Sequence, residues 1–388
     1  MRLDRVGHAP ADPAGVWRAV LDLAGGPLPF VLQIEGGRGR WTGRLCNGAE
    51  CQAASTIRRE GDSLVVDLAD YAATIVVVER GDSLLGRYSN VGRRGPRTIS
   101  FRATRGVPAL AGAPNALVGR WDAWFQSGFD ATPRVLLVEN TPTGVEGTVI
   151  SNSGDYGRFG GEMLGDTLRL GHFDGSFVYL LTAHLEGDTL RGTFHAGLRS
   201  QTPFVAVRST GRRHLTPPTE VTRADSTVPF SFAAPDLEGR LVRSSDARFR
   251  GKVVLIDIFG TWCPTCHDAA PLLAELYRDY HARGLEVVGL AFEVAGDSTI
   301  DAPQVRRYRD KFGLMFPLLL GGTSDVETVA ALLPGLAGFT AFPTTIFLGR
   351  DGRVRRIHAG FYGAVTGSAH DALVAEFRRE VERLLREE

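Results

Sequence analysis

Short apolar runs separated by turn residues fill the first half of the chain. Runs rich in Val, Ile, Leu, Thr and aromatic side chains, such as 74–79 and 177–182, are separated by Gly-Asp, Asn-Gly or Gly-Gly pairs. These pairs favour tight hairpin turns, so the pattern predicts an antiparallel meander. A long meander leaves unpaired edge strands unless the sheet curls until these strands pair. The pattern therefore predicts either two small barrels or one shared barrel.

The same half of the chain carries an internal repeat. The segment Gly-Val-Trp-Arg-Ala at 15–19 returns as Gly-Arg-Trp-Asp-Ala at 119–123, a separation of 104 residues. The tetrad Gly-Asp-Ser-Leu at 61–64 returns at the same separation as Gly-Asp-Thr-Leu. Self-similarity at a fixed period indicates a tandem duplication of a β-meander, here of residues 13–106 and 117–211.

The pattern changes after residue 211. Residues 212–228 have neither periodicity nor apolar content, which indicates a linker. From 229 onward, nearly continuous apolar runs alternate with helical patterns, which predicts an α/β domain. The expected elements are strands at 253–259 and 285–292, helices at 264–283 and 304–312, a strand at 316–320, a short helix at 326–333, a hairpin of 344–348 with 353–358, and a terminal helix at 370–386. The fold class is therefore multidomain, with an all-β duplicated meander or barrel region followed by an α/β domain.

Composition narrows the class of protein. Hydrophobic residues make up 43% and charged residues 23%, and Lys+Arg equals Asp+Glu at 44 each. A chain of zero net charge has no basic field to gather nucleic acid, so no nucleic-acid partner is expected. The apolar runs are shorter than the roughly 20 residues of a transmembrane helix, and residues 1–13 lack the apolar core of a signal peptide. Neither a transmembrane segment nor a signal peptide is therefore expected in this chain.

Four cysteines form two close pairs, Cys46 with Cys51 and Cys263 with Cys266. The second pair lies where a predicted buried strand passes into a helix, in the sequence Trp-Cys-Pro-Thr-Cys. A cysteine at a helix N-terminus meets unpaired backbone amides that favour its thiolate, and a cysteine one turn further on lies within disulfide distance. We therefore expect Cys263 to attack a substrate disulfide and Cys266 to resolve the mixed disulfide.

Residues from about 228 to 388 resemble the TlpA/ResA-like thiol-disulfide oxidoreductases of the thioredoxin superfamily. The resemblance rests on Phe-Ala-Ala-Pro-Asp-Leu-Glu-Gly-Arg at 232–240, Gly-Lys-Val-Val-Leu-Ile-Asp at 251–257, Phe-Gly-Thr-Trp-Cys-Pro-Thr-Cys at 259–266 and Phe-Pro-Thr at 342–344. It implies a thioredoxin fold over 229–388 and does not extend to the duplicated β region. The Pro-Thr dipeptide is also similar to that of the cytochrome c maturation thioredoxins, whose usual role is reductive.

The resemblance implies roles for residues around the dithiol. Pro343 is implied to be a cis-proline that faces the cysteines. The residues implied to contact the substrate are Trp262, Pro264, Thr265, Phe342 and Thr344. Asp257 matches the buried carboxylate of thioredoxins, and burial would raise its pKa so that it exchanges a proton with Cys266. The other interpretation of Asp257 is a strand-end aspartate that only bonds the backbone.

Other side chains near the dithiol are expected to have smaller roles. The glutamate that ResA-like proteins carry three residues after the second cysteine is Ala269 in this chain, so that proton route is missing. Glu293, at the end of the second core strand, is a candidate to replace that route, but a carboxylate at a strand end is expected to be solvated instead. His267 is expected to be exposed on the first turn of the helix, where it would tune Cys263.

Some motifs point to other chemistry. The Cys263/Cys266 pair fits half of a zinc site, but no second ligand pair lies nearby in the sequence, so no metal is expected. With His267 it also forms the Cys-x-x-Cys-His pattern of c-type haem attachment, which we rank below redox chemistry because a buried strand precedes it and Phe-Pro-Thr follows later. Gly-Asp-Ser-Leu names a class of serine hydrolases, yet it recurs in both copies and is interpreted as hairpin chemistry.

Cys46 and Cys51 bracket a predicted hairpin tip. Their spacing leaves a structural disulfide, free thiols and a redox relay all open. A disulfide would close a small loop and stabilise the fold little, and it would favour an extracytoplasmic compartment.

The expected function is a thiol-disulfide oxidoreductase that reduces protein disulfides in the cell envelope. Its partners would be protein disulfide substrates and an upstream thiol reductant, with no cofactor beyond the redox-active disulfide. By resemblance the location is periplasmic or in the cell envelope, and a cytoplasmic location is the alternative because no signal peptide is found. Two other functions stay open: a thiol peroxidase of the peroxiredoxin type, and a β-region binding module of unknown ligand with an accessory redox domain.

Overall fold

Alternating burial makes the first half of the chain fold into strands. Buried side chains recur at every second position along β2 (Gly26–Gly37) and β7 (Ala73–Arg80). This period places them on one face of a sheet, which turns inward.

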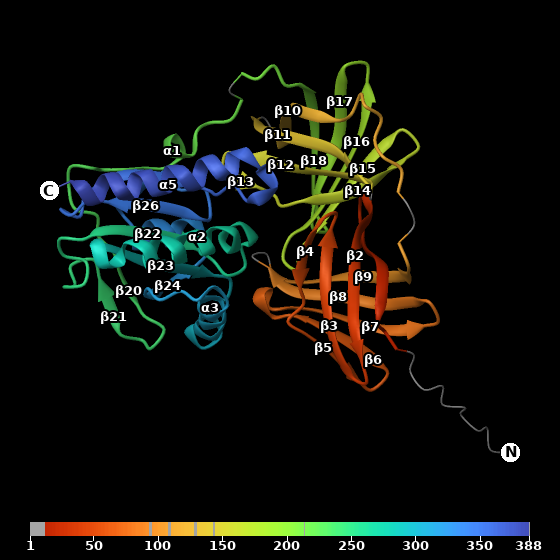
Figure 1. Ribbon diagram of the computed structural model, residues 1–388, viewed down its shortest axis with the longest axis horizontal. Coiled ribbons are helices and arrows are strands. Elements are labelled where there is room, and N and C mark those ends of the chain that lie inside the picture. The colour runs from red at the N-terminus through yellow and green to blue at the C-terminus, as the bar shows by residue number, and fades with distance from the viewer. Residues whose placement is uncertain are drawn as a thin grey trace.

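The computed structural model describes residues 12–387 except 93–94, 108–109, 128–129, 143 and 213 (Figure 1). Residues 1–11, on which the expectation about a signal peptide largely rests, lie outside the described residues.

Two sheets of nine strands account for the duplicated region. The first contains β1 (Gly15–Leu23), β2, β3 (Arg40–Asn47), β4 (Glu50–Ala53), β5 (Thr56–Glu60), β6 (Ser63–Leu68), β7, β8 (Ser83–Gly92) and β9 (Gly95–Arg105). The second contains β10 (Gly119–Ser127), β11 (Asp130–Thr141), β12 (Gly144–Ser151), β13 (Gly154–Asp155), β14 (Phe159–Leu164), β15 (Thr167–Phe173), β16 (Val178–Glu186), β17 (Thr189–Ala196) and β18 (Ser200–Arg208).

Each sheet closes on itself. The first has the strand order β2-β1-β9-β8-β7-β6-β5-β3-β4, and β2 also pairs with β3, which joins the ends. The second repeats this order from β11 to β13 and closes through the pairing of β11 with β12. Closure pairs edges that would otherwise stay open. The region therefore forms two antiparallel barrels, which pack against each other (Figure 1), and not one shared barrel.

The two barrels are equivalent in detail. Trp17 in β1 and Trp121 in β10 are both buried, and each indole N–H donates to the backbone carbonyl four residues earlier, at 2.9 Å in both cases. The guanidinium of Arg105 lies 4.2 Å from the Trp17 ring centroid, and that of Arg208 lies 4.0 Å from the Trp121 ring centroid. The duplication therefore preserves a cation–π pair that anchors the first strand of each barrel.

The Gly-Asp-Ser-Leu and Gly-Asp-Thr-Leu tetrads are hairpin turns. Gly61, Gly81, Gly165 and Gly187 have φ between 58° and 63°, a left-handed conformation that glycine adopts without a Cβ clash. Each lies between two paired strands, and the serine or threonine that follows starts the second of them. Their interpretation as hairpin chemistry is confirmed.

The two barrels contact each other through apolar side chains and through a pair of hydrogen bonds. Phe173 of the second barrel lies in the hydrophobic cluster of the first, with its ring 4.8 Å from that of Phe30. The Asn47 side chain donates to the Phe173 carbonyl at 3.0 Å and accepts the Phe173 amide at 2.9 Å. Asn47 lies at the tip of the hairpin of β3 and β4, and a disulfide joins Cys46 to Cys51 directly behind this tip. The disulfide therefore braces the hairpin tip that carries Asn47.

A five-stranded sheet forms the centre of the remaining part, in the order β24-β23-β22-β26-β27. Its strands are β22 (Val253–Phe259), β23 (Leu285–Glu293), β24 (Leu318–Thr323), β26 (Thr344–Leu348) and β27 (Val354–Ala359). β23 and β24 run parallel to β22, and β26 runs antiparallel to it. Every residue of β22 and β23 is buried, as expected for strands covered on both faces. This part is a thioredoxin-like α/β domain.

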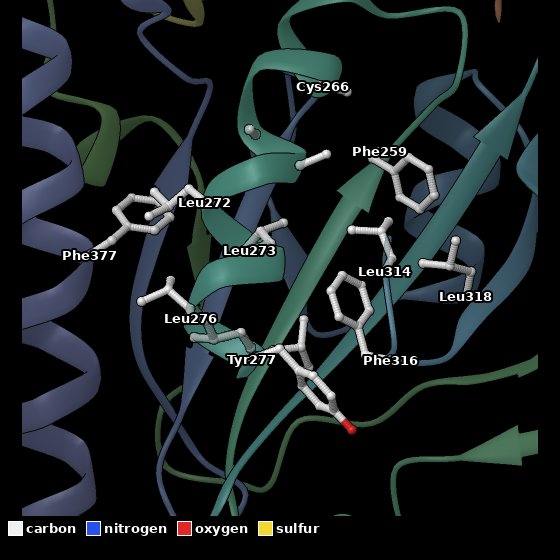
Figure 2. Close-up of a cluster of buried hydrophobic side chains, with 14 of the residues drawn as sticks. Phe259, Cys266, Leu272, Leu273, Leu276, Tyr277, Leu314, Phe316, Leu318 and Phe377 are labelled. Carbon is white, nitrogen blue, oxygen red and sulfur yellow. The ribbon is translucent and has the colours of Figure 1, made fainter. Parts of the chain in front are cut away.

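Helices cover both faces of this sheet. They are α2 (Pro264–Tyr280), α3 (Ser298–Phe312), α4 (Val326–Leu332) and α5 (Ser368–Arg386). α2, α3 and α5 share one hydrophobic cluster, in which Leu272 of α2 and Phe377 of α5 lie (Figure 2). α4 contributes to the cluster on the other face, together with the pair of β20 (Ala233–Pro235) and β21 (Leu241–Arg243). The sheet thus holds the start of α2 between two apolar layers.

Two expectations about local structure differ from the observed fold. The expected linker contains α1 (Pro218–Val221) and β19 (Arg223–Ala224), and β19 pairs with β25 (Leu336–Ala337). A strand of two residues leaves no periodic signal in a sequence. α3 begins at Ser298, earlier than the expected residue 304, because the Asp297 side chain accepts the Thr299 amide at 2.8 Å and caps the helix.

Within the part of the chain that the structure describes, no helix combines the length and the apolar content that crossing a membrane requires.

Replacing either anchoring tryptophan should cost the same stability. Trp17→Ala and Trp121→Ala each remove a buried ring, its hydrogen bond and its cation–π contact, and each should lower the free energy of unfolding by about 3–5 kcal/mol. Denaturant unfolding followed by circular dichroism would measure both. A loss below about 1 kcal/mol for only one of them would contradict the equivalence of the two barrels.

Candidate active site

The dithiol lies at the start of a helix. β22 ends at Phe259, and the chain turns before α2 begins at Pro264. Proline suits the first helical position because its missing N–H would be unpaired there. Cys263 is the N-cap residue, and its carbonyl accepts the amides of Cys266 at 3.0 Å and His267 at 3.3 Å. Cys263 therefore lies at the positive end of the helix dipole, which stabilises a thiolate.

Cys266 lies one turn further into the helix, where Figure 2 shows it near Phe259 of β22. Its exposed fraction is 1%, against 3% for Cys263. Burial, followed by the neighbouring Cys263 and Asp257, raises the pKa of the Cys266 thiol well above its usual value. Cys266 therefore holds its proton at neutral pH.

The loop before β26 faces Cys263. The Phe342–Pro343 peptide bond is cis, and the Cys263 Sγ donates to the Phe342 carbonyl oxygen at 3.6 Å. The ring of Trp262 meets that of Phe342 edge to face, with centroids 5.3 Å apart. Trp262 is held in turn by its indole N–H, which donates to the Phe292 carbonyl at 2.9 Å. The loop and the tryptophan therefore border the Cys263 sulfur.

Asp257 lies inside the central strand β22 and is 4% exposed. Its Oδ1 has no hydrogen-bond partner among the described residues. Burial raises the pKa of this carboxyl to about 7. Its charge is also one of the causes of the raised pKa of Cys266, so the two groups interact through space. The carboxyl is thus able to accept a proton near neutral pH.

Glu293, at the end of β23, is 4% exposed, so the expectation that it is solvated is wrong. The turn between β22 and α2 folds over the end of β23, where Glu293 accepts the Thr261 amide at 2.9 Å and the Thr261 hydroxyl at 2.7 Å. Burial raises the pKa of Glu293 to about 7. Glu293 holds the turn that leads into Cys263.

His267 is buried, so the expectation of an exposed side chain is also wrong. Tyr71 of the first barrel stacks on its ring, with centroids 4.8 Å apart. The carbonyl of Thr261 lies 2.8 Å from Nε2, and the Lys311 ammonium lies 3.3 Å from Nδ1. These partners require a proton on Nε2 and a lone pair on Nδ1. Burial, and then Lys311, lowers the pKa of His267 to about 4, so the ring is neutral and adds no positive charge beside Cys263.

The residues expected to contact the substrate divide into two groups. Trp262, Pro264 and Phe342 are partly exposed. Thr265 and Thr344 are buried, and the Thr344 hydroxyl donates to the Ala341 carbonyl at 2.8 Å. Those two threonines therefore support the loop and the helix from inside.

Contacts from the barrels reach the site, and sequence reasoning missed them. Ser176 of the second barrel donates from Oγ to the Trp262 carbonyl at 2.7 Å. In the first barrel, the Asp70 carbonyl accepts from Gln304 at 2.7 Å, and the Asp70 carboxylate pairs with Lys311 at 2.6 Å. The partners in these contacts lie between 86 and 241 residues apart. No motif marks them, so no signal in the sequence could have found them.

The arrangement supports thiol-disulfide exchange. It combines a thiol at a helix N-terminus, a second thiol one turn away and a buried carboxyl that titrates near neutral pH. Among the described residues, no group of three or more His, Cys, Asp or Glu side chains is arranged to hold a metal ion.

Comparison with known proteins locates this site in a shared domain. The Redoxin family matches residues 223–367. The thiol-disulfide oxidoreductase ResA of Geobacillus thermodenitrificans is 34% identical over 135 residues, which cover 35% of this chain and 68% of that relative. The thiol-disulfide oxidoreductase ResA of Halalkalibacterium halodurans is 27% identical over 149 residues, covering 38% of this chain and 71% of the relative.

Among solved structures, a thiol:disulfide interchange protein of the thioredoxin family from Chlorobium tepidum TLS is similar, with 24% identity and a TM-score of 0.32 over 42% of this chain and 99% of the other. The residues matched by the Redoxin family include the dithiol, the central strands and most of the domain that carries them. The chain therefore belongs to the TlpA/ResA-like thiol-disulfide oxidoreductases of the thioredoxin superfamily.

Proposed function

We propose that this oxidoreductase reduces disulfide bonds in proteins of the cell envelope by a cycle of Cys263 and Cys266. The observation that carries the proposal is the position of Cys263, an N-cap cysteine whose Sγ lies 3.6 Å from the Phe342 carbonyl. A sulfur in this position combines a stabilised thiolate with a neighbouring loop backbone along which an extended substrate segment can lie.

The proposed cycle has two exchanges. The Cys263 thiolate attacks one sulfur of the substrate disulfide, a mixed disulfide forms, and the other substrate sulfur leaves as a thiolate that takes up a proton. The Cys266 thiolate then attacks Cys263 Sγ, the Cys263–Cys266 disulfide forms, and the second substrate sulfur leaves in the same way. The substrate gains two electrons and the dithiol loses two. An upstream thiol reductant restores the dithiol by the reverse exchanges.

Asp257 is the proposed base of the second exchange. The raised pKa of Cys266 means that its proton must leave before it can attack. Asp257, with a pKa of about 7, is half ionised near neutral pH and has no competing hydrogen bond at Oδ1 among the described residues. Proton transfer from Cys266 to Asp257 would produce the attacking thiolate without exposing either group to bulk water.

Two observations support the direction and the compartment. The Pro264-Thr265 dipeptide between the cysteines is similar to that of reductive thioredoxins of cytochrome c maturation. The Cys46–Cys51 disulfide supports an oxidising compartment, since cytosolic thiols are normally kept reduced.

Cys266→Ser should trap a mixed disulfide on Cys263. Without the resolving thiol, the first exchange proceeds and the second cannot, so a substrate adduct accumulates while turnover is lost. Mass spectrometry of alkylated, non-reduced peptides would locate the adduct. Cys263→Ser is the matched control and should form none. An adduct on Cys266 in the Cys263→Ser control would show that Cys266 can make the first attack, and this result would overturn the mechanism.

Asp257→Asn should remove a pH dependence from the second exchange. In the wild type, the rate of resolution should rise as the pH passes through about 7, because the ionised carboxyl is the base. The variant should resolve about 10²-fold more slowly at pH 8 and show no inflection near 7. Rapid-quench measurement of Cys263–Cys266 disulfide formation would give the rate of resolution at each pH. Glu293→Gln is the control, because Glu293 is equally buried with a pKa of about 7 but bonds Thr261. An unchanged profile in Asp257→Asn would exclude Asp257 as the base.

The same carboxyl should make folding stability depend on pH. The folded pKa of Asp257 is about 7 and the ordinary value is 3.8, so between these values the folded state binds a proton that the unfolded state releases. The contribution of Asp257 to the free energy of unfolding should therefore be greatest below pH 3.8. This contribution should be lost as the pH rises towards 7. Denaturant titrations at pH 5 and pH 8 should show a smaller fall in stability for Asp257→Asn than for the wild type.

A further inference from the structure

A cavity of about 380 Å³ lies beside Trp262, the residue before Cys263, where both barrels meet the redox domain. Its walls come from the hairpin of β8 and β9, the loop between β15 and β16, the hairpin of β17 and β18, and Trp262. Its volume falls within the range of small-ligand sites, about 300–1,000 Å³. The cavity is therefore a composite of three parts of the chain that the redox domain alone would lack.

The cavity contacts residues that neighbour the dithiol, although neither cysteine is among its described lining residues. Trp262 precedes Cys263 and is bonded through its carbonyl to Ser176, which also lines the cavity. Tyr71, another wall residue, stacks on His267, which follows Cys266. Tyr179 lines the cavity as well, and its pKa is raised well above the usual value, first by burial and in part by neighbouring groups that include Cys263. The cavity therefore borders Trp262, the residue directly before Cys263.

The charge of the walls is positive. Arg97 and Arg199 line the cavity, and its described lining contains no Asp or Glu. The Arg97 guanidinium donates only to neutral partners in the described structure, the Asn90 side chain at 2.9 Å, the Tyr88 hydroxyl at 3.0 Å and the Ser176 carbonyl at 2.6 Å. A half-buried guanidinium without a carboxylate partner attracts an anion more strongly than a solvated one.

Asp174, an acidic side chain close to the wall residues Tyr71 and Tyr179, bonds other groups. Asp174 accepts the backbone amides of Ser176 and Phe177, both at 2.7 Å, and pairs with His172 at 3.1 Å. Asp174 therefore shapes the loop between β15 and β16, and among the described residues it forms no ion pair with Arg97.

The barrels also limit what reaches the dithiol. Cys263 is 3% exposed, and the two hairpins and the β15–β16 loop adjoin the partly exposed Trp262 next to it. A disulfide on the rigid surface of a folded protein would have to displace these loops. A narrow carrier such as an unfolded peptide segment or a small molecule would not.

We propose that this cavity is the substrate site of the dithiol and selects disulfides that have a carboxylate close to the sulfur on a narrow, flexible carrier. The inference rests on the proposed function and adds the substrate class to it. The carboxylate would meet the arginine pair while the aromatic walls, Trp262 and Tyr179, contact the carbon chain beside the sulfur. The exchange itself is the two-step cycle already described, with the same balance of electrons and protons.

The test compares substrates that differ only in charge. The reduced full-length chain is mixed with dithiodipropionate or with its neutral diamide, and with a linear peptide disulfide that has Glu or Gln beside each half-cystine. The wild type should favour the carboxylate member of each pair by about 10-fold in kcat/KM, the size expected for one charge-assisted hydrogen bond. In Arg97→Gln and Arg199→Gln this ratio should fall towards 1.

One control variant and the second arginine variant keep the test decisive. Arg87→Gln removes an exposed arginine of β8 outside the cavity lining and should retain the wild-type ratio. Because Arg97 also bonds Tyr88 and Ser176, Arg199→Gln provides a readout from an exposed side chain with less risk to the fold. A ratio that falls equally in Arg87→Gln would mean only a general charge effect and would overturn the assignment.

The outcomes separate this inference from the proposed function. A carboxylate preference with the peptide pair, the small-molecule pair or both supports the cavity and identifies the carrier. Equal rates for charged and neutral members, or reduction of a folded disulfide protein as fast as its unfolded form, would overturn the cavity as a selective site while leaving the dithiol cycle intact. Absence of exchange with every substrate, including the neutral ones, would instead reject the proposed function.

Discussion

Exclusion of water from the dithiol is the constraint on which the chemistry of this site depends. Cys263 and Cys266 are 3% and 1% exposed, and they lie between a fully buried strand and the apolar cluster beneath α2. In such surroundings the charged form of an acid is disfavoured, so Asp257 acquires a pKa of about 7. The same effect keeps Cys266 protonated. Burial therefore acts on both acids of the site in the same direction, because it raises the pKa of the carboxyl and of the thiol.

The same burial acts in the opposite direction on a base. His267 looks from its position like a cation beside the attacking thiol, but burial and the Lys311 ammonium lower its pKa to about 4. The ring is neutral, and the backbone amides at the start of α2 remain to stabilise the Cys263 thiolate. Stabilising the thiolate in this way needs no salt bridge. A buried charged side chain next to the sulfur would have carried a large desolvation cost.

The duplicated barrels complete this enclosure through corresponding loops. The loop after β6 in the first barrel carries Tyr71, which stacks on His267, and the loop after β15 in the second carries Ser176, which bonds the Trp262 carbonyl. These two loops occupy equivalent positions in the two barrels, and each makes a different contact with the same site. Closed barrels suit this role because a paired framework holds its loops in place. The Cys46–Cys51 hairpin and Asn47 fix the second barrel against the first.

The sequence by itself determined the features that depend on neighbours in the chain. Turn glycines, alternating apolar positions and a repeat predict the duplicated β region, and the spacing of Cys263 and Cys266 before a helix predicts the dithiol, because strands, turns and helix starts are set by local chemistry. It could not determine the burial of Glu293 and His267, since a strand end and a first helical turn look exposed until Thr261 and Tyr71 cover them. Nor could it place the barrels over Trp262 or build a cavity from three separate parts of the chain. Those features were decided by the tertiary structure alone, because each rests on contacts between residues brought together only when the chain is folded.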